Sequence, residues 1–337
     1  MRVYYASTAG GVRRAVFDLM DALGWERLVE RGSDALLKVN LTWDYLRPGV
    51  NTGPWVVEAV AERLKARCGR IFLGESSQIL VDADRSLRAG GMAAVCERQD
   101  LTWHNFSSNS WVTVERNGLT FGIPGICTRM PTISIPVVKT HYRTGISIAL
   151  KNLYGCLNDG RHNYHYRLPD YLAAVNMAIP VLFTVADGTV SLEGNGPKPG
   201  KPLRTDFCAA SEDRVAMDAS LARTMGFDPS CIPILEAAEG MVGSSAGLEE
   251  VPLPPMAAVP SFHFSPARPN FVARVEKLLR RSSRGQGDSP LMGVMRLGAR
   301  QWYRAAYVLL GQKREAMRLI DGLPYGPQWL GVREEER

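Results

Sequence analysis

The stretch "TISIPVVKTHYRTGISIALKNLYG", residues 132–155, decides how this chain folds. It begins with a run of β-branched and apolar residues, which is typical of a buried strand, and this run ends in Lys139, Thr140 and His141. Apolar residues then recur at helical spacing from Thr144 to Gly155. A buried strand followed directly by a helix is the repeating unit of α/β proteins, so the stretch predicts an α/β fold.

The same alternation extends over the first 230 residues and predicts a mostly parallel sheet with helices on both faces. An Asn-Gly pair at 117–118, between alternating apolar residues, predicts an inserted hairpin over residues 111–125. The expected strands lie at 2–7, 34–41, 70–76, 101–106, 132–141 and 181–188, and the expected helices at 12–25, 51–69, 86–99, 144–155, 168–179 and 213–226.

Composition and charge divide the chain into three parts: an α/β core over 1–250, a Pro-rich linker over 251–269 and a basic helical extension over 270–337. The net charge is +6, but residues 266–320 hold 12 Lys/Arg against three Asp/Glu, which leaves the remainder near −3. Because the core is not basic, no nucleic-acid partner is expected. The chain shows neither a long apolar span nor the pattern of a signal peptide, so we expect a cytoplasmic protein.

Six cysteines are scattered singly along the chain, with no C-x-x-C pair. Iron–sulfur clusters and zinc–thiolate sites need cysteines at short, regular spacings. No iron–sulfur cluster is therefore expected from this chain's own cysteines, and reduced thiols are expected in a cytosolic protein.

Polar and charged side chains stand where the predicted strands end. Because the carboxyl ends of parallel strands meet at one edge of a sheet, where ligands bind, we expect these side chains to form one site. They are Lys38 and Asn40, then Glu75, then Lys139 and His141, then Asp187, and shortly after it Glu193 and Asn195.

The predicted helix after His141 adds the positive end of its dipole to this edge. Lys139, His141, Arg143 and the helix start would make an anion pocket, with Lys151 and Asn152 two turns further on. Neither a G-x-G-x-x-G motif nor a Walker A motif is present, so the usual nucleotide fingerprints are missing.

His162 and His165 form an H-x-x-H pair in "DGRHNYHYRLPD". On a helix this spacing places both rings on one face, where they could ligate a metal together with His141. The neighbouring Gly160 and Pro169 favour a loop instead. Metal ligation, acid–base work or substrate contact, and structural hydrogen bonding all remain open for this pair.

Several of these motifs resemble the domain of unknown function 362 family. The matching stretches, spread over residues 30–230, are "LLKVNL", "NTGPWVVEAVAERLK", "IFLGES", "IPVVKTHYRTGISIALKNLYGCL", "VADGTVSLEGNGPKPGKP" and "DRVAMDASLARTMGFDP". Many members of that family carry a ferredoxin-like iron–sulfur module, whereas this chain has its basic extension in that place. The resemblance implies a site that includes Lys139, His141, Lys151, Asn152, Asp187 and Glu193.

Three hypotheses of function follow. In the first, an enzyme binds a small anionic metabolite through Lys38, Asn40, Arg143, Lys151, Asn152, Glu193 and Asn195. Lys139, His141, His165, Asp187 and Glu75 carry the acid–base chemistry of a redox, isomerase or lyase step in a specialised biosynthetic pathway. In the second, His141, His162, His165 and a carboxylate hold a divalent metal such as iron for an oxidoreductase.

In the third hypothesis, residues 270–320 bind a membrane surface or a partner protein without catalysis, because basic amphipathic helices suit both. The alternative for these helices, which we favour, is a lid packed back over the sheet with its basic face in solvent. The organic cofactor, if there is one, and the oligomeric state, including a homo-oligomer, are left open by the sequence.

Overall fold

The computed structural model describes residues 1–78, 80–268, 298, 301, 305, 307, 309 and 311–326, without the side chains of Asp159 and His162. Its strands are β1 (Arg2–Ser7), β2 (Ala35–Val39), β3 (Ile71–Glu75), β4 (Thr102–Asn105), β5 (Trp111–Arg116), β6 (Leu119–Pro124), β7 (Thr132–Ile135), β8 (Val137–His141), β9 (Gly145–Ser147), β10 (Val181–Glu193), β11 (Lys201–Ser211) and β12 (Glu249–Pro252).

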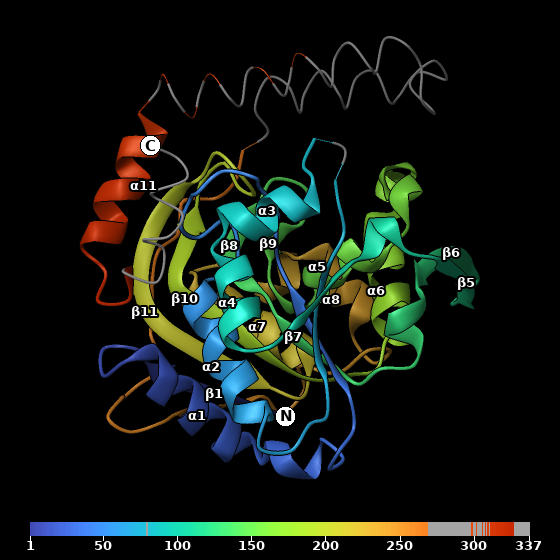
Figure 1. The fold of residues 1–337 in the computed structure, drawn as a ribbon, viewed down its shortest axis with the longest axis horizontal. Coiled ribbons are helices and arrows are strands. Elements are labelled where there is room, and N and C mark those ends of the chain that lie inside the picture. Colours follow the sequence, from blue (N-terminus) through green and yellow to red (C-terminus); the bar gives the residue numbers. More distant parts are fainter. Residues whose placement is uncertain are drawn as a thin grey trace.

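The α-helices alternate with these strands along the chain (Figure 1). They are α1 (Val12–Leu23), α2 (Pro54–Leu64), α3 (Ala83–Ala89), α4 (Met92–Arg98), α5 (Ala149–Asn152), α6 (Leu168–Ala178), α7 (Arg214–Thr224), α8 (Pro233–Ala238) and α11 (Gln312–Asp321). Short 3₁₀ segments η4 (Leu153–Cys156) and η5 (Asp159–Arg167) follow α5. No described helix is long and apolar enough to cross a membrane.

The main sheet is mostly parallel, as predicted. Its order is β12-β1-β11-β10-β7-β2-β3-β4, with β8 and β9 attached beside β10. Only the pairs β1–β11, β10–β11 and β8–β9 are antiparallel. The predicted hairpin is present as the separate two-stranded sheet of β5 and β6.

Helices cover both faces of this sheet, because successive strand residues point to opposite sides. On β2, Leu37 joins the core formed with α1, α2 and α4, whereas its neighbour Leu36 joins the core formed with α6 and η4. A third core, around Phe207 of β11, packs against α5, α7 and α8. The α/β prediction, with helices on both faces, is therefore confirmed.

Three predicted elements have different bounds in the structure. Pro136 has no N–H for a sheet ladder, and the predicted strand 132–141 is divided there into β7 and β8. The Gly90–Gly91 pair divides the predicted helix 86–99 into α3 and α4. The strand predicted at 181–188 continues to Glu193 and pairs with β11, a strand that the sequence analysis missed.

Residues 251–268 of the predicted linker run along the core. They begin within β12, and Phe262 N and Phe264 N then donate to the carbonyls of Thr224 and Met225 at 2.8 and 2.9 Å. Most of the predicted extension, including residues 270–297, lies outside the described residues. Its α11 lies beside β10 and β11 (Figure 1), where Ile320 joins the core that includes residues of both strands.

Candidate functional site

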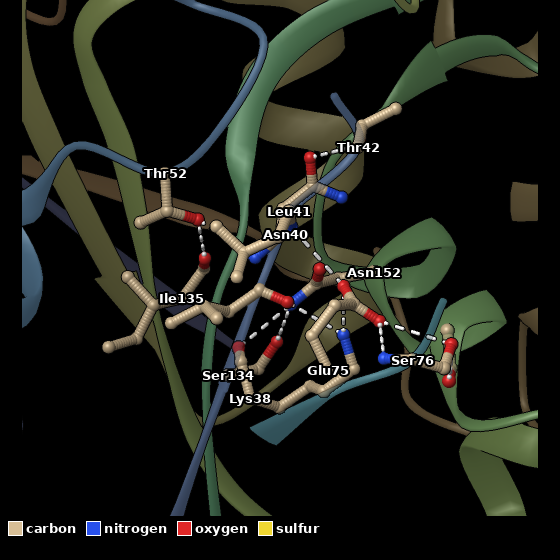
Figure 2. A network of polar contacts seen from close by, with 12 residues as sticks. Lys38, Asn40, Leu41, Thr42, Thr52, Glu75, Ser76, Ser134, Ile135 and Asn152 are labelled. Atoms are coloured by element: carbon tan, nitrogen blue, oxygen red, sulfur yellow. Dashed lines mark hydrogen bonds and ion pairs between the residues drawn. The ribbon is translucent and has the colours of Figure 1, made fainter. Parts of the chain in front are cut away.

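A buried ion pair joins β2 to the end of β3 (Figure 2). Lys38 Nζ donates to Glu75 Oε2 at 2.9 Å and to the carbonyl of Val39 at 2.7 Å. The other oxygen, Glu75 Oε1, accepts from Ser76 N at 2.7 Å. Both side chains are almost fully buried. The pair is thus charge-balanced and hydrogen-bonded, the condition that a buried ion pair needs to be tolerated.

Asn152 ties α5 to the same place (Figure 2). Its Nδ2 donates to the carbonyl of Lys38 and to Ser134 Oγ, each at 3.0 Å. A carbonyl can only accept, so this contact fixes the orientation of the amide. Asn152 Oδ1 is then left buried with no hydrogen-bond partner among the described residues.

Lys139 of β8 is also buried but has no carboxylate partner among its hydrogen bonds. Its Nζ donates to Asn40 Oδ1 at 2.6 Å, to the carbonyl of Val50 at 2.7 Å and to Thr42 Oγ1 at 3.2 Å. Burial first, and then the positive charges of nearby lysines, hold the pKa of Lys139 well below its usual value. All three ammonium protons are used to hold the loop at 40–50.

His141 stands two residues further, at the end of β8. Its Nδ1 accepts from Arg143 N at 3.1 Å, which places the proton of the neutral ring on Nε2. The ring stacks on Tyr142, with centroids 5.2 Å apart. Burial, and then the charge of Lys151, hold the pKa of His141 well below its usual value, so the imidazole is neutral at pH 7.

Lys151 of α5 is half-buried and lies over an aromatic ring. Its Nζ is 3.9 Å from the centroid of Tyr154, a cation–π contact. No hydrogen bond to this Nζ is formed by the described residues. Burial first, and then the charge of Arg161, lower the pKa of Lys151 to about 7. This amine can therefore gain or lose a proton near neutral pH.

The helix predicted over 144–155 is mostly wrong, so the start of a helix does not contribute to the predicted anion pocket as expected. Residues Gly145–Ser147 form β9, which pairs with β8 in a tight hairpin. The short helix α5 begins only at Ala149. Asp218 of α7 occupies its first turn, accepting from Ala149 N at 2.7 Å and Leu150 N at 3.2 Å. The helix N-terminus thus binds a side chain of the protein itself.

Asp187 lies within β10 and not at a strand end, which corrects its predicted place. Its Oδ2 accepts from Gly53 N at 2.7 Å at the start of α2, and its Oδ1 accepts from Thr189 Oγ1 at 2.6 Å. Burial raises the pKa of Asp187, and these hydrogen bonds oppose the shift. Asp187 is thus hydrogen-bonded to the start of α2 and within its own strand, and its position in β10 is paired with Val137 of β8.

Of the other predicted residues, Glu193 ends β10 and Asn195 follows it, whereas His165 lies beside Tyr154, and its charge is, after burial, among the smaller causes that lower the pKa of His141. Glu193 Oε2 accepts from Ser265 N at 2.9 Å, and Asn195 is exposed. His165 Nε2 is 2.9 Å from the hydroxyl of Tyr154, and the two rings stack. The side chain of His162 lies outside the described residues.

Among the described residues, no group of three His, Cys, Asp or Glu side chains is arranged to hold a metal ion. The metal hypothesis therefore stays a prediction.

Two further cations reach the site and were missed by the sequence analysis. Arg161 of η5 is 1% exposed and donates to the carbonyl of Leu157 at 3.0 Å. Lys198 is half-buried in the loop after β10, within the "EGNGPKPGK" motif that the resemblance contained. Burial lowers the pKa of Lys198 to about 8, and the charge of Asp44 opposes this shift.

These side chains influence one another's charge and together form what we call the cationic cluster. Glu75 and Asp44 are carboxylates whose negative charge opposes the lowering of the pKa by burial, Glu75 at Lys139 and Lys151 and Asp44 at Lys198. The cluster comprises Lys38, Lys139, His141, Arg143, Lys151, Arg161 and Lys198.

Comparison with known proteins gives a family and distant relatives. A thylakoid-associated protein of Synechocystis is 28% identical over 244 residues, which cover 68% of this chain and 75% of that protein. A crystal structure of a Thermotoga maritima protein covers 57% of this chain and 53% of its own, with 12% identity and a TM-score of 0.35, too distant to carry an argument. The model of the domain of unknown function 362 family matches residues 35–223, more than half of the chain. The chain belongs to the domain of unknown function 362 family.

Proposed function

We propose that this protein is an enzyme that binds a small anionic metabolite at the cationic cluster and moves a proton with Lys151 and His141. The observation that carries the proposal is the amine of Lys151, which is half-buried among other cations and has no hydrogen-bond partner among the described residues. A bound carboxylate or phosphate would supply that partner.

Charge balance supports an anionic ligand. Removing charged groups from water is costly unless opposite charges compensate them. In this cluster Glu75 compensates Lys38, whereas Lys139 has only neutral oxygen acceptors. Because the surplus is positive, an anion would gain strongly from entering.

The hydrogen bonds and pKa shifts suggest a different role for each of Lys139, Lys151 and His141. Lys139 donates its protons to the loop at 40–50 and so positions that loop. Lys151, with a pKa of about 7, suits general acid–base catalysis at neutral pH. Neutral His141 offers an Nε2–H donor for a developing oxyanion. This set fits an isomerase or lyase step next to a carboxylate, and a redox step is the alternative.

Binding of simple anions tests the proposal. Inorganic phosphate titrated into the protein by calorimetry should bind, and Lys151→Met should weaken this binding about tenfold, as expected for losing one charge-assisted hydrogen bond. Lys65→Met, which removes an exposed lysine, is the matched control and should leave binding unchanged. Equal affinity of the Lys151→Met variant and the parent would contradict the proposal.

A second proposal, association with a membrane from its cytoplasmic side through residues 270–320, draws on the relative named as thylakoid-associated. The excess of basic residues in this segment would favour anionic lipid. Co-sedimentation with vesicles of neutral lipid, with and without anionic lipid, tests it. Binding that does not depend on anionic lipid would argue against it.

A further inference from the structure

The loop between β10 and β11 brings Lys198 to the cationic cluster. Hydrogen bonds from three residues outside this loop help to hold it: Thr140 Oγ1 donates to the carbonyl of Gly194 at 2.9 Å, Tyr142 N to that of Gly196 at 3.4 Å, and Arg47 Nη2 to that of Gly200 at 2.6 Å. A side chain at position 196 would collide with the backbone of Thr140. The backbone is thus fixed both before and after Lys198 in the sequence.

Lys198 itself is incompletely paired. The described residues give its Nζ no hydrogen bond, and the charge that favours its ammonium form is that of Asp44. Asp44 is buried and also faces Arg85, at 3.5 Å, so one carboxylate serves two cations. The ammonium of Lys198 therefore has donor capacity left for an anionic partner.

Lys151 and Lys198 belong to different elements, α5 and the loop after β10, and that loop bonds to Thr140 and Tyr142 at the end of β8. Burial first, and then the charges of both lysines, lower the pKa of Lys139. The charges that act on Lys151 are those of Arg161, Glu75, Arg143 and Lys38, whereas the charge that acts on Lys198 is that of Asp44 in the loop at 40–50. Lys139 itself already donates its protons to neutral oxygen acceptors, including those of Asn40 and Val50.

We propose that the ligand carries two anionic groups, one bound by Lys151 and the other by Lys198. This rests on the proposed function and narrows its substrate class to small dianions, either dicarboxylates or compounds with two phosphoryl groups. Among the described residues neither lysine Nζ has a hydrogen-bond acceptor, and two separate oxyanions would supply one to each. A ligand with one anionic group would leave one of these lysines without a partner.

Matched probes test the second subsite. Methylenediphosphonate and succinate each carry two anionic groups, and methylphosphonate and propionate are their single-group counterparts. Calorimetry on the full chain should show that at least one double-group probe binds about tenfold more tightly than its counterpart. Which pair shows the preference distinguishes a phosphoryl ligand from a carboxylate ligand.

Lys198→Gln should abolish this preference and leave the single-group probes within about twofold of the parent, since their subsite at Lys151 is intact. Lys201→Gln, which removes an exposed lysine near the same loop, should retain the preference, and thermal melts should show that both variants fold. A preference that survives Lys198→Gln, or that is lost equally in Lys201→Gln, overturns the second subsite. If Lys151→Met changes no probe's affinity, the proposed function fails as well.

Discussion

Lys38 and Lys139 lie on strands of one sheet and are equally buried, yet their partners differ. Lys38 has the carboxylate of Glu75, whereas Lys139 has only amide, hydroxyl and carbonyl oxygens. Lys151 has the face of a tyrosine. We call Lys38 and Glu75, whose buried charges compensate each other, the balanced region. We call Lys139 and Lys151, which have no carboxylate among their hydrogen-bond partners, the unbalanced region. We infer that the balanced region stabilises the fold and that the unbalanced region binds the proposed ligand.

The largest expected effect is on the titration of Lys151. With a pKa of about 7, its amine should be mostly neutral at pH 8. A lysine in a peptide has a pKa of ~10.4. The neutral fraction of such a peptide lysine at pH 8 is therefore about two orders of magnitude smaller than the fraction expected for Lys151. Competitive acetylation read by mass spectrometry gives the midpoint, with the unfolded chain as control. A titration midpoint near that of the unfolded chain would contradict the inference that uncompensated positive charge and burial lower the pKa of Lys151.

The sign of the linked stability follows from the same shift. Between pH 7 and about 10 the unfolded chain holds the Lys151 proton and the folded chain does not. This group therefore makes the folded state more stable as pH rises through that window. Phosphate affinity should change in the opposite direction, because the ammonium is lost.

The next effect is on the balanced region. Glu75→Gln keeps the shape of the side chain but leaves Lys38 buried without a counter-charge. Loss of one partner of a buried pair costs about 3–5 kcal/mol of unfolding free energy. Urea denaturation measures it.

Two variants control this experiment. Glu62→Gln breaks an exposed pair with Arg13 and should cost under about 1 kcal/mol. The double variant Lys38→Met/Glu75→Leu should recover much of the loss, because no charge is left unpaired. If Glu75→Gln costs no more than Glu62→Gln, the pair does not support the fold.

A smaller loss is expected at Gly155, which packs on the same pair. A Cβ there would collide with Glu75 Oε1 and lie 3.0 Å from Lys38 Nζ. Because Ser76 N and Lys38 hold the carboxylate, it cannot simply turn away, and Gly155→Ala should cost about 2 kcal/mol. Gly160→Ala, with no atom within 4 Å of its Cβ, is the matched control. Equal thermal melts for the two variants would argue against tight packing here.

Much of the balanced region could be predicted from the sequence. Apolar runs located β2 and β3, and the topology of parallel sheets brought their ends, with Lys38 and Glu75, together. Local pattern sufficed because each strand is short and its neighbours are parallel. Asn152 was also expected at this edge, and it contacts Lys38.

The unbalanced region could not be predicted in the same way. Residues 144–148 have helical spacing, but pairing of β9 with β8 prevails over it, and a distant carboxylate, Asp218, sets where α5 begins. Asp187 looked like a strand end because the apolar run stops there, whereas β10 continues through Glu193. Lys198 lies in a loop whose path depends on contacts with Thr140 and Arg47. Long-range contacts of this kind leave no local signal in a single sequence.

The smallest effect concerns the support of the loop at 40–50, which holds Lys139. The hydroxyl of buried Tyr307 donates to the carbonyl of Leu46 at 2.8 Å. This residue from the C-terminal part of the chain therefore helps to hold the loop. Tyr307→Phe should cost about 1 kcal/mol, the usual net value of one such bond. Leu309→Ala, at a side chain that is 79% exposed, should change stability by less than about 0.5 kcal/mol. If urea denaturation gives the two variants the same stability, the hydroxyl of Tyr307 is not needed to hold the loop, and Lys139 relies on the loop's own contacts alone.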